Sequence, residues 1–449
     1  MNSKFKKLLL AVVDYLLAFF SLFIVLYIRY PDLLGTEFLW QHIQVFSWLF
    51  LVWLLVFYAW DLYSFTVKWN SGFLVSAFII NLGIGVTLFY AVPSMEITPK
   101  TNLVLLIIIY AVLFIGWRGL VSFFLKQMAK NRKILAIGND EHLISLMNRI
   151  KANPKIGFTI TALYGMEPGN EAISSSIYLI NDKSELKAYI EKEGIETVVV
   201  SDKWYGGVMK ELYALIPLGI NIYHLATFHD LFLDSIPIYA TSEVWFLDHL
   251  RNVNNTFYNL FKRFQDILIC VVFFPVILFF GLIAALLVKF SSRGPIFYSQ
   301  MRVGKDEKDF RIYKFRSMRT DAEKDGAQWS KKNDSRITPI GSFLRSTRLD
   351  ELPQVINILK GDMSFVGPRP ERPEFVDGLA KEIPHYHLRH LVRPGLTGWA
   401  QILFPYGDSI EDAARKLEYD LYYLKNKSIL LDIKIALKTI KVVLGKMGR

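Results

Sequence analysis

The most informative segment of the sequence runs from Asp334 to Glu371 and reads DSRITPIGSFLRSTRLDELPQVINILKGDMSFVGPRPE. A proline at 353, the apolar residues around it and Gly361 predict one short helix whose first turn holds Asp350 and Glu351. Carboxylates in a first turn meet the positive end of the helix dipole, which keeps them ionised and leaves backbone donors free for phosphate oxygens. Adjacent residues project about 100° apart around a helix, so we expect the two carboxylates to have different roles.

This pair of carboxylates suits chemistry at phosphorus. An ionised aspartate is a competent nucleophile toward phosphorus, and a second carboxylate can bind a metal ion or handle a proton. Arg345 and Arg369 lie on either side of the pair, and the prolines at 368 and 370 restrict the direction of Arg369. An isolated Asp-Glu at a helix start is more often structural than catalytic, and the residues alone leave that alternative open.

A basic strand precedes this segment. Lys314 and Arg316 lie two residues apart in the strand-like run Tyr313–Met318, so both are expected on one face of the strand. Two fixed cations on one face suit a diphosphate. The alternative is a solvated basic strand, which is the usual explanation of a charge run taken alone.

An apolar run from Ile267 to Val288 is long enough to cross a bilayer, and Pro275 interrupts it. Basic residues flank both ends, among them Lys262 and Arg263 before the run. A full crossing would place one basic cluster outside the cell, whereas a helix bent at the proline can return to the side it entered from. We therefore expect a re-entrant helix over 262–290, with a straight fifth span as the alternative.

Residues 126–250 alternate short β-rich runs with polar helical runs, which predicts an α/β domain with a mainly parallel, Rossmann-like sheet. The first strand ends at Ile137 and is followed by Gly138, where a dinucleotide-binding domain has a G-x-G-x-x-G loop. The sequence has the first glycine of that pattern and lacks the other two. We expect a structural or regulatory domain that binds no nucleotide.

Four apolar stretches open the chain, each about as long as a membrane-spanning helix, at 8–28, 43–60, 73–92 and 103–124. Basic residues precede the first stretch and follow the fourth, so the positive-inside rule places both ends of this helical bundle in the cytoplasm. Asp14 lies within the first stretch. We expect it to make a packing contact with a polar neighbour such as Asn81, without a partner cation at membrane depth; a functional carboxylate is the alternative.

The composition of the 449-residue chain agrees with a membrane protein of several domains. Hydrophobic residues make up 52% and charged residues 21%, which excludes a disordered chain. Cys270 is the single cysteine, so no intramolecular disulfide and no cysteine-based zinc or iron–sulfur framework can form. The net charge of +11 fits nucleic acid, anionic lipid or a phosphorylated substrate alike. We predict a four-helix transmembrane region at 1–125, an α/β domain at 126–250 and a third domain at 251–449.

From Lys262 onward, the sequence resembles the bacterial sugar transferase domain of the polyprenyl-phosphate hexose-1-phosphate transferases, the monotopic phosphoglycosyl transferases. The motifs that carry this resemblance are Lys262-Arg263-x-x-Asp266, KFRSM from Lys314, LDELPQ from Leu349, GDMSFVGPRPE from Gly361 and RPGLTGWAQ from Arg393. The whole chain resembles the long form of the family, which starts exopolysaccharide or O-antigen repeat units. The resemblance implies an α/β catalytic domain with a re-entrant membrane helix.

The resemblance also implies roles for individual residues. Asp350 would be the nucleophile and Glu351 its partner, and both would bind Mg²⁺. Pro275 would break the re-entrant helix, and the residues around the substrate phosphates would be Lys314, Arg316, Arg345, Arg369 and Arg393. Two positions depart from the family pattern: Phe274 precedes the proline, whose usual position is about one turn later, and Glu307 stands where a glycine is common.

The implied reaction transfers hexose 1-phosphate from a UDP-hexose to undecaprenyl phosphate through an aspartyl phosphosugar, releasing UMP and forming undecaprenyl-diphosphate-hexose. The implied location is the bacterial inner membrane, with the α/β and catalytic domains in the cytoplasm. The expected partners are these two substrates and the lipid bilayer, with no nucleic acid, while the hexose and a homodimer stay open. One alternative is a membrane-tethered NAD-dependent sugar-nucleotide dehydratase, but residues 134–250 lack its glycine fingerprint and Tyr-x-x-x-Lys helix. The other is a non-catalytic scaffold of polysaccharide assembly.

Two weaker signals lie near the C-terminus. A metal-binding cluster is one interpretation of three closely spaced histidines, His385, His387 and His390. The sequence shows no acidic partner for them, so we interpret them as solvated or packing residues. The run Leu430–Leu444 has lysines between aliphatic residues, which fits either a helix on anionic lipid or a helix packed on the domain.

Overall fold

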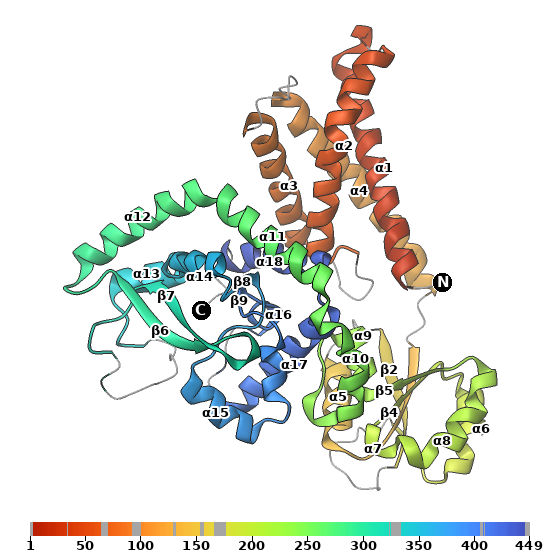
Figure 1. Cartoon of the computed structure of the whole chain (residues 1–449). Helices are drawn as coiled ribbons and strands as arrows, with labels where there is room; N and C mark the ends of the chain where they lie inside the picture. The colour runs from red at the N-terminus through yellow and green to blue at the C-terminus, as the bar shows by residue number, and fades with distance from the viewer. Residues whose placement is uncertain are drawn as a thin grey trace.

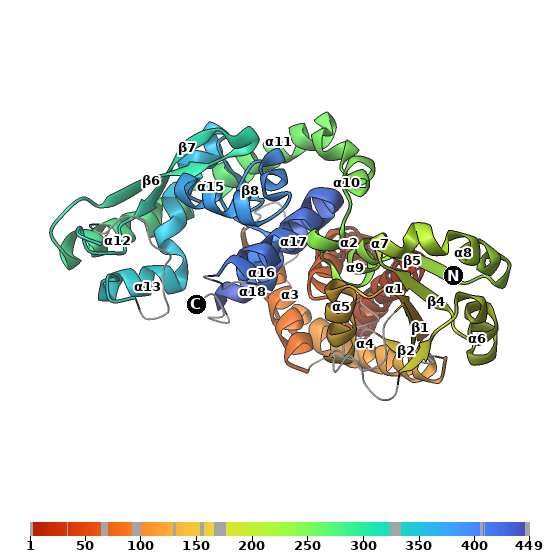
Figure 2. The ribbon, with the colours of Figure 1, turned by 90° about the horizontal axis from the view of Figure 1, so that it is seen from below.

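The computed structural model describes residues 3–33, 35–63, 71–91, 100–128, 132–152, 157–165, 177–322, 324, 334–404, 407 and 409–444. These residues form a helical bundle, a five-stranded sheet with helices on its faces, and a mixed C-terminal unit (Figure 1). Seen from below, helix α17 (Ile410–Asn426) lies between the five-stranded sheet and the hairpin of strands β6 (Phe297–Val303) and β7 (Asp309–Phe315) (Figure 2).

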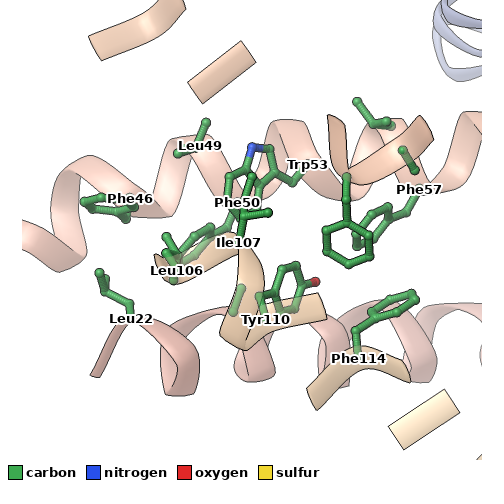
Figure 3. Close-up of a cluster of buried hydrophobic side chains, with 14 of the residues drawn as sticks. Leu22, Phe46, Leu49, Phe50, Trp53, Phe57, Leu106, Ile107, Tyr110 and Phe114 are labelled. Atoms are coloured by element: carbon green, nitrogen blue, oxygen red, sulfur yellow. The ribbon is translucent and has the colours of Figure 1, made fainter. Parts of the chain in front are cut away.

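The bundle consists of α1 (Ser3–Arg29), α2 (Thr36–Ala59), α3 (Ser71–Ala91) and α4 (Lys100–Met128). Helices α1, α2 and α4 are long and apolar enough to span a membrane, and α3 contains a shorter apolar segment. The facing sides of these helices bury a core rich in aromatic rings, in which Trp53 stacks on Tyr110 and Phe57 packs against Phe114 (Figure 3). The apolar stretches predicted from the sequence are therefore the helices of one bundle.

Asp14 forms a buried ion pair with Arg118 of α4, at 2.5 Å between Oδ2 and Nη2. Tyr110 donates a hydrogen bond to the backbone carbonyl of Asp14 at 3.1 Å. The expected contact of Asp14 with Asn81 in the absence of a cation is therefore wrong. Arg118 lies inside the fourth apolar stretch, and the antiparallel packing of α1 and α4 brings it opposite the carboxylate. Burying either charge alone is costly, so the pair is a structural link between the two helices.

The α/β domain contains five parallel strands in the order β3-β2-β1-β4-β5. The strands are β1 (Arg132–Ile137), β2 (Phe158–Tyr164), β3 (Tyr178–Ile180), β4 (Thr197–Val200) and β5 (Asn221–His224). The helices that follow them are α5 (Glu141–Ala152), α6 (Leu186–Glu193), α7 (Asp202–Tyr205), α8 (Met209–Leu215) and α9 (Leu225–Leu233). Two separate apolar cores cover the two sheet faces, which explains the nearly continuous apolar runs of β1 and β4.

The side chain of Trp204 packs at the carboxyl end of this sheet. An added Cβ at Gly138, just after β1, would lie 2.8 Å from Cβ of Ser201, and one at Gly165 would lie 2.7 Å from the Trp204 ring. The indole also donates to Asn139 Oδ1 at 3.1 Å. In open α/β sheets a ligand binds at this end, between the strands where the order reverses. The Trp204 ring thus packs closely at this end of the sheet, and the absence of a bound nucleotide stays a prediction from the missing glycines.

The segment before the predicted boundary at 250 shares a core with the C-terminal unit. Buried side chains of Ile236, Ile238, Trp245 and Phe246 pack in the same cluster as residues from 303 to 435. Backbone and side-chain bonds reinforce this contact, since Ile236 N donates to the Glu418 carbonyl at 3.0 Å and Trp399 Nε1 to the Asp234 carbonyl at 3.1 Å. Helix α10 (Glu243–His249) is thus packed as part of the C-terminal unit.

The C-terminal unit combines short strands with many short helices. Its two small sheets are the antiparallel hairpin β6–β7 and the parallel pair of β8 (Ser364–Val366) and β9 (Gly395–Thr397). Its helices, apart from α17, are α11 (Thr256–Val272), α12 (Phe274–Ser291), α13 (Pro339–Thr347), the 3₁₀-helix η9 (Leu349–Gln354), α14 (Val355–Lys360), α15 (Pro373–Glu382), η10 (Tyr386–Leu391), α16 (Trp399–Leu403) and α18 (Ile429–Leu444).

Helices α11 and α12 meet at Phe273, and Pro275 is the second residue of α12. Proline has no backbone N–H and clashes with the preceding turn, so the helix breaks just before it. Figure 1 shows the two helices inclined to each other as an arch. Helix α12 is long and apolar enough to span a membrane, and most of its surface is exposed in the structure.

The Lys262-Arg263-x-x-Asp266 motif of α11 connects this helix to the rest of the C-terminal unit. Lys262 Nζ donates to Asp432 of α18 at 2.7 Å, and the Arg263 guanidinium donates to the carbonyls of Ile358 and Leu359 at the end of α14. Asp266 accepts hydrogen bonds from the Ser364 hydroxyl and from Phe365 N, both at 3.1 Å. These three side chains therefore fix the position of α11 relative to α18, α14 and β8.

Helix α18 packs against the C-terminal end of α2, where two of its lysines contact Asp61. Lys434 Nζ lies 2.7 Å from Asp61 Oδ1, and Lys438 contacts the other oxygen of the same carboxylate. Burial alone would raise the pKa of Asp61, but the two ammonium groups hold it below its usual value. The sequence left two interpretations of α18, a helix on anionic lipid or a helix packed on the protein. The structure favours the second, because Lys434 and Lys438 are largely buried and pair with Asp61.

Candidate active site

A short 3₁₀-helix presents the two carboxylates. Thr338 caps α13 by accepting a hydrogen bond from Gly341 N, and the helix ends at Arg348, whose positive φ of 60° starts a tight turn into η9. Asp350 and Glu351 lie in η9, and α14 begins only at Val355. The predicted single helix is therefore two, because Pro353 has no N–H to continue an α-helical hydrogen-bond pattern.

Glu351 is buried and compensated by three cations. Its Oε1 lies 3.1 Å from Lys314 Nζ and 3.3 Å from Arg369 Nη2, and its Oε2 lies 3.7 Å from Arg348 Nη1. Burial alone would raise the pKa of Glu351, but these three cations hold it well below its usual range. Glu351 is thus ionised at any physiological pH, and it positions Lys314 and Arg369 beside Asp350.

Asp350 is in a different environment, as the sequence predicted for adjacent carboxylates. The side chain is buried, and its Oδ1 has no hydrogen-bond partner among the described residues. Burial, together with the charge of Glu351, raises the pKa of Asp350 to about 6. Desolvation therefore outweighs the positive groups near Asp350, and its pKa lies above the usual value while that of Glu351 lies below it.

Two arginines of the Arg345–Arg348 turn act on Asp350 through their charge. Arg345 and Arg348 both lower its pKa, against the larger effect of burial. Arg345 Nε also donates to the Ser317 hydroxyl at 3.0 Å, which joins α13 to the end of the hairpin. Sequence reasoning singled out Arg345 and missed Arg348. The available signal was its spacing, three residues before Glu351 in a helical turn.

Lys314 and Arg316 do not meet at one site. Strand β7 ends at Phe315, and the Arg316 guanidinium turns to the end of α12, donating to the carbonyls of Arg293 and Ser292 at 3.0 and 2.7 Å. Arg316 is also buried. The expected pair of cations on one strand face is thus split: Lys314 contacts Glu351, and Arg316 caps a helix C-terminus.

Arg393 lines a cavity away from the two carboxylates. That cavity is lined by side chains of α11, including Lys262, and by Lys305 and Lys427, and its lining includes neither Asp350 nor Glu351. Of the five predicted phosphate-binding residues, the structure therefore brings Lys314, Arg345 and Arg369 to the two carboxylates and gives Arg316 and Arg393 other surroundings.

The loop that carries Arg369 is held by close backbone packing. Strands β8 and β9 pair, and Gly367 N donates to the Thr397 carbonyl at 2.9 Å while Gly395 N donates to the Pro368 carbonyl at 2.8 Å. An added Cβ at Gly367 would lie 2.4 Å from the Arg393 carbonyl oxygen. Gly367 and Gly395 therefore allow the two backbone segments to pack closely against each other.

Buried polar side chains support the same loop and the hairpin. Arg389, paired with Asp420 at 2.8 Å, donates to the Arg369 carbonyl at 3.0 Å, and Arg302 donates to the Pro370 carbonyl at 3.0 Å. The sequence analysis also missed Asn357, whose amide bridges from α14 to the Arg311 carbonyl and Tyr313 N of β7, at 2.7 and 3.2 Å.

The carboxylates fit a hard divalent cation. Mg²⁺ prefers carboxylate oxygens, and the buried, unpartnered Oδ1 of Asp350 is a ligand atom of that kind. The oxygens of Glu351 contact three cations, of which Arg348 is the most distant at 3.7 Å from Oε2. Oδ1 of Asp350 is thus the better candidate ligand atom. Of the two oxygens of Glu351, Oε2 has the longer contact with a cation.

The geometry agrees with comparisons to known proteins. A family model for bacterial sugar transferases matches residues 257–446. The chain is 33% identical over 331 residues to the UDP-glucose:undecaprenyl-phosphate glucose-1-phosphate transferase of Klebsiella pneumoniae, covering 72% of this chain and 70% of that protein. The chain belongs to the bacterial sugar transferase family. The resemblance carried by the sequence motifs is thereby confirmed.

The names of two further relatives specify different sugars, N-acetylgalactosamine in one and glucose in the other. The chain is 46% identical over 208 residues to the UDP-N-acetylgalactosamine-undecaprenyl-phosphate N-acetylgalactosaminephosphotransferase of Aeromonas hydrophila, over 45% of this chain and 49% of that protein, about half its length. It is 32% identical over 335 residues to the UDP-glucose:undecaprenyl-phosphate glucose-1-phosphate transferase of Escherichia coli K12, over 70% of this chain and 68% of that protein.

The close packing at Gly367 predicts that alanine is less well tolerated there than at Gly378. Gly367→Ala should destabilise the fold by about 1–3 kcal/mol and reduce activity, because the new methyl group overlaps the Arg393 carbonyl. Gly378→Ala is the control, since that glycine is in exposed helix α15 with open space around it, and alanine should stabilise the helix slightly. Thermal unfolding in detergent measures both. Equal melting temperatures for the two variants would contradict the packing argument.

Proposed function

We propose that this sugar transferase transfers a hexose 1-phosphate from a UDP-hexose to undecaprenyl phosphate, with release of UMP and formation of undecaprenyl-diphosphate-hexose. The observation that carries the proposal is Asp350, a buried carboxylate with an unpartnered oxygen beside a carboxylate neutralised by cations. The names of the relatives support the same acceptor and reaction type. Such a transfer would be the first membrane step of exopolysaccharide, capsule or O-antigen synthesis.

In the proposed mechanism, a carboxylate oxygen of Asp350 attacks the β-phosphorus of the UDP-hexose. A bond forms between that oxygen and phosphorus, the bond to the oxygen bridging the two phosphorus atoms breaks, and UMP leaves with the electron pair. An oxygen of undecaprenyl phosphate then attacks the same phosphorus and releases the Asp350 carboxylate. Lys314, Arg345 and Arg369 supply positive charge where negative charge develops on the phosphoryl oxygens. Mg²⁺ held by Asp350 and Glu351 would neutralise phosphate charge when bound.

The active site would lie on the cytoplasmic face of the bacterial inner membrane. Undecaprenyl phosphate presents its phosphate at the membrane surface, so the enzyme must hold its carboxylates there. The break at Phe273 and the exposed apolar surface of α12 support a re-entrant α11–α12 pair that enters and leaves on that face. The α/β domain, Rossmann-like in its strand order, would serve as structural or regulatory support.

A panel of UDP-sugars tests the function. Full-length protein in nanodiscs with undecaprenyl phosphate and Mg²⁺ should release UMP with at least one of UDP-glucose, UDP-galactose, UDP-N-acetylglucosamine and UDP-N-acetylgalactosamine. Without lipid, the intact mass should increase by one hexose phosphate, and Asp350→Asn should abolish both the adduct and turnover. Asp362→Asn, a carboxylate in the same segment outside the site, is the control. An adduct on Asp350→Asn would disprove the nucleophile, and no UMP release with any donor would favour the scaffold alternative.

The pKa of Asp350 predicts the pH dependence of the reaction. The attacking form is the carboxylate, so kcat/KM should be level well above pH 6 and fall about tenfold per pH unit below about pH 6. Arg345 lowers this pKa, so Arg345→Gln should move the midpoint to higher pH, whereas Arg319→Gln, at an exposed arginine, should leave it unchanged. A midpoint that stays fixed in Arg345→Gln would contradict the assignment of the titrating group.

Cysteine labelling tests the re-entrant arrangement. Cys270→Ser removes the single native thiol, and Thr256→Cys and Ser291→Cys place new thiols at exposed ends of α11 and α12. Both new thiols should react with an impermeant maleimide from the cytoplasmic side of sealed vesicles. Lys4→Cys, before the first span, reports the cytoplasmic side. Labelling of the two thiols from opposite sides would establish a straight fifth span.

A further inference from the structure

A second group of chemically competent side chains lies at the tip of the β6–β7 hairpin, outside the carboxylate site. Glu307 in the hairpin turn contacts Nδ1 of His387 in η10, and one of its oxygens lies 3.7 Å from Nδ1 of His390. One ligand atom from each of the three side chains lies within 4.8 Å of the others. The sequence analysis dismissed these histidines because no acidic partner was apparent. That reason is wrong, because Glu307 lies 80 residues before His387 and the fold brings it there.

His390 gives an independent indication of a ligand. The ring is 7% exposed, and its Nδ1 is buried without a hydrogen-bond partner among the described residues. A buried polar atom without a partner carries a desolvation cost that a bound ion would remove.

The three side chains suit a borderline transition metal. Two imidazole nitrogens and one carboxylate oxygen are a donor set that binds Zn²⁺, while Mg²⁺ favours oxygen ligands and retains its waters. His387 and Glu307 are 58% and 50% exposed, so an ion could enter from solvent and retain a water in its fourth position. Small side-chain movements would bring the three atoms from their present spacing to bonding distance of one ion.

We propose that Glu307, His387 and His390 form a Zn²⁺-class metal site, separate from the catalytic carboxylates. Such an ion would cross-link the hairpin turn to η10. Helix η10 also carries Arg389, which donates to the Arg369 carbonyl at 3.0 Å, so the site would stabilise the position of the loop that places Arg369. Its role is structural support of the transferase domain, and no step of the reaction passes through it.

Zinc binding to the full-length protein in detergent tests the site. Chelator-stripped protein is titrated with Zn²⁺ against a chromogenic zinc chelator, and bound metal is counted by mass spectrometry after gel filtration. We expect one tightly bound Zn²⁺ per chain and at least tenfold weaker binding in both Glu307→Gln and His387→Ala. These two side chains are exposed, so the variants should fold even where a His390 variant does not. Co²⁺ in place of Zn²⁺ should give the visible absorption of a four-coordinate ion.

Two controls distinguish this site from others. His385→Asn should bind Zn²⁺ as the parent protein does, because His385 packs on Phe246 and its positive φ suits asparagine. Asp350→Asn should also retain the zinc, and Zn²⁺ should raise the melting temperature of the parent but not of Glu307→Gln, with Mg²⁺ giving no such difference. Unchanged zinc affinity in Glu307→Gln and His387→Ala, absence of stoichiometric zinc, or loss of zinc only in Asp350→Asn would each overturn the proposal. None of these readouts depends on transferase activity.

Discussion

The arrangement of the catalytic domain depends on the compensation of one buried carboxylate. Glu351 is 6% exposed, and a charge in that position is tolerated only with close positive partners. Its partners come from three separate places: Lys314 from β7, Arg369 from the loop after β8, and Arg348 from the end of α13. One ion-pair network thus defines where a strand, a loop and a helix end must meet. Asp350 lies at that meeting point, and its Oδ1 has no partner in the part of the chain that the structure describes, because Glu351 makes the direct cation contacts.

The surrounding structure serves to keep these cations in place. Asn357 holds β7 against α14, close backbone packing at Gly367 and Gly395 fixes the Arg369 loop, and the Ser317 hydroxyl holds Arg345. Each support is a partly buried hydrogen bond or a close backbone contact that leaves no room for a side chain, which makes the geometry stiff. A stiff cluster of cations suits phosphoryl transfer, where the protein contributes chiefly position and charge.

Local sequence patterns predicted local features well. The apolar stretches of the bundle, the strands of the α/β domain and the carboxylates of LDELPQ each follow from a period, a turn signal or a motif in one segment. Partners distant in sequence were predicted poorly. Arg118 opposite Asp14, Lys434 opposite Asp61 and Glu307 opposite His387 are pairs whose members are far apart along the chain. Strand residues alternate between two faces, and this alternation predicted that Arg316 would share a face with Lys314. The strand ends at Phe315, so the alternation does not apply to Arg316.

The same kind of charge compensation connects the helical bundle to the candidate active site. Asp61 at the end of α2 pairs with Lys434 and Lys438 of α18, and Asp432 of α18 pairs with Lys262 of α11. Asp266, one turn further along α11, accepts hydrogen bonds from Ser364 and Phe365 of β8, the strand that leads to Arg369.

These contacts form a continuous series from a membrane-spanning helix to a cation of the active site. These contacts give a fixed spacing to two exposed apolar surfaces, those of the bundle and of α12. In the proposed arrangement both surfaces lie in one bilayer, so the depth of the bilayer around the bundle would set the height of the carboxylates above it. A phosphate on a membrane-bound acceptor has little freedom in that direction, so the buried ion pairs between helices contribute directly to where the reaction can take place.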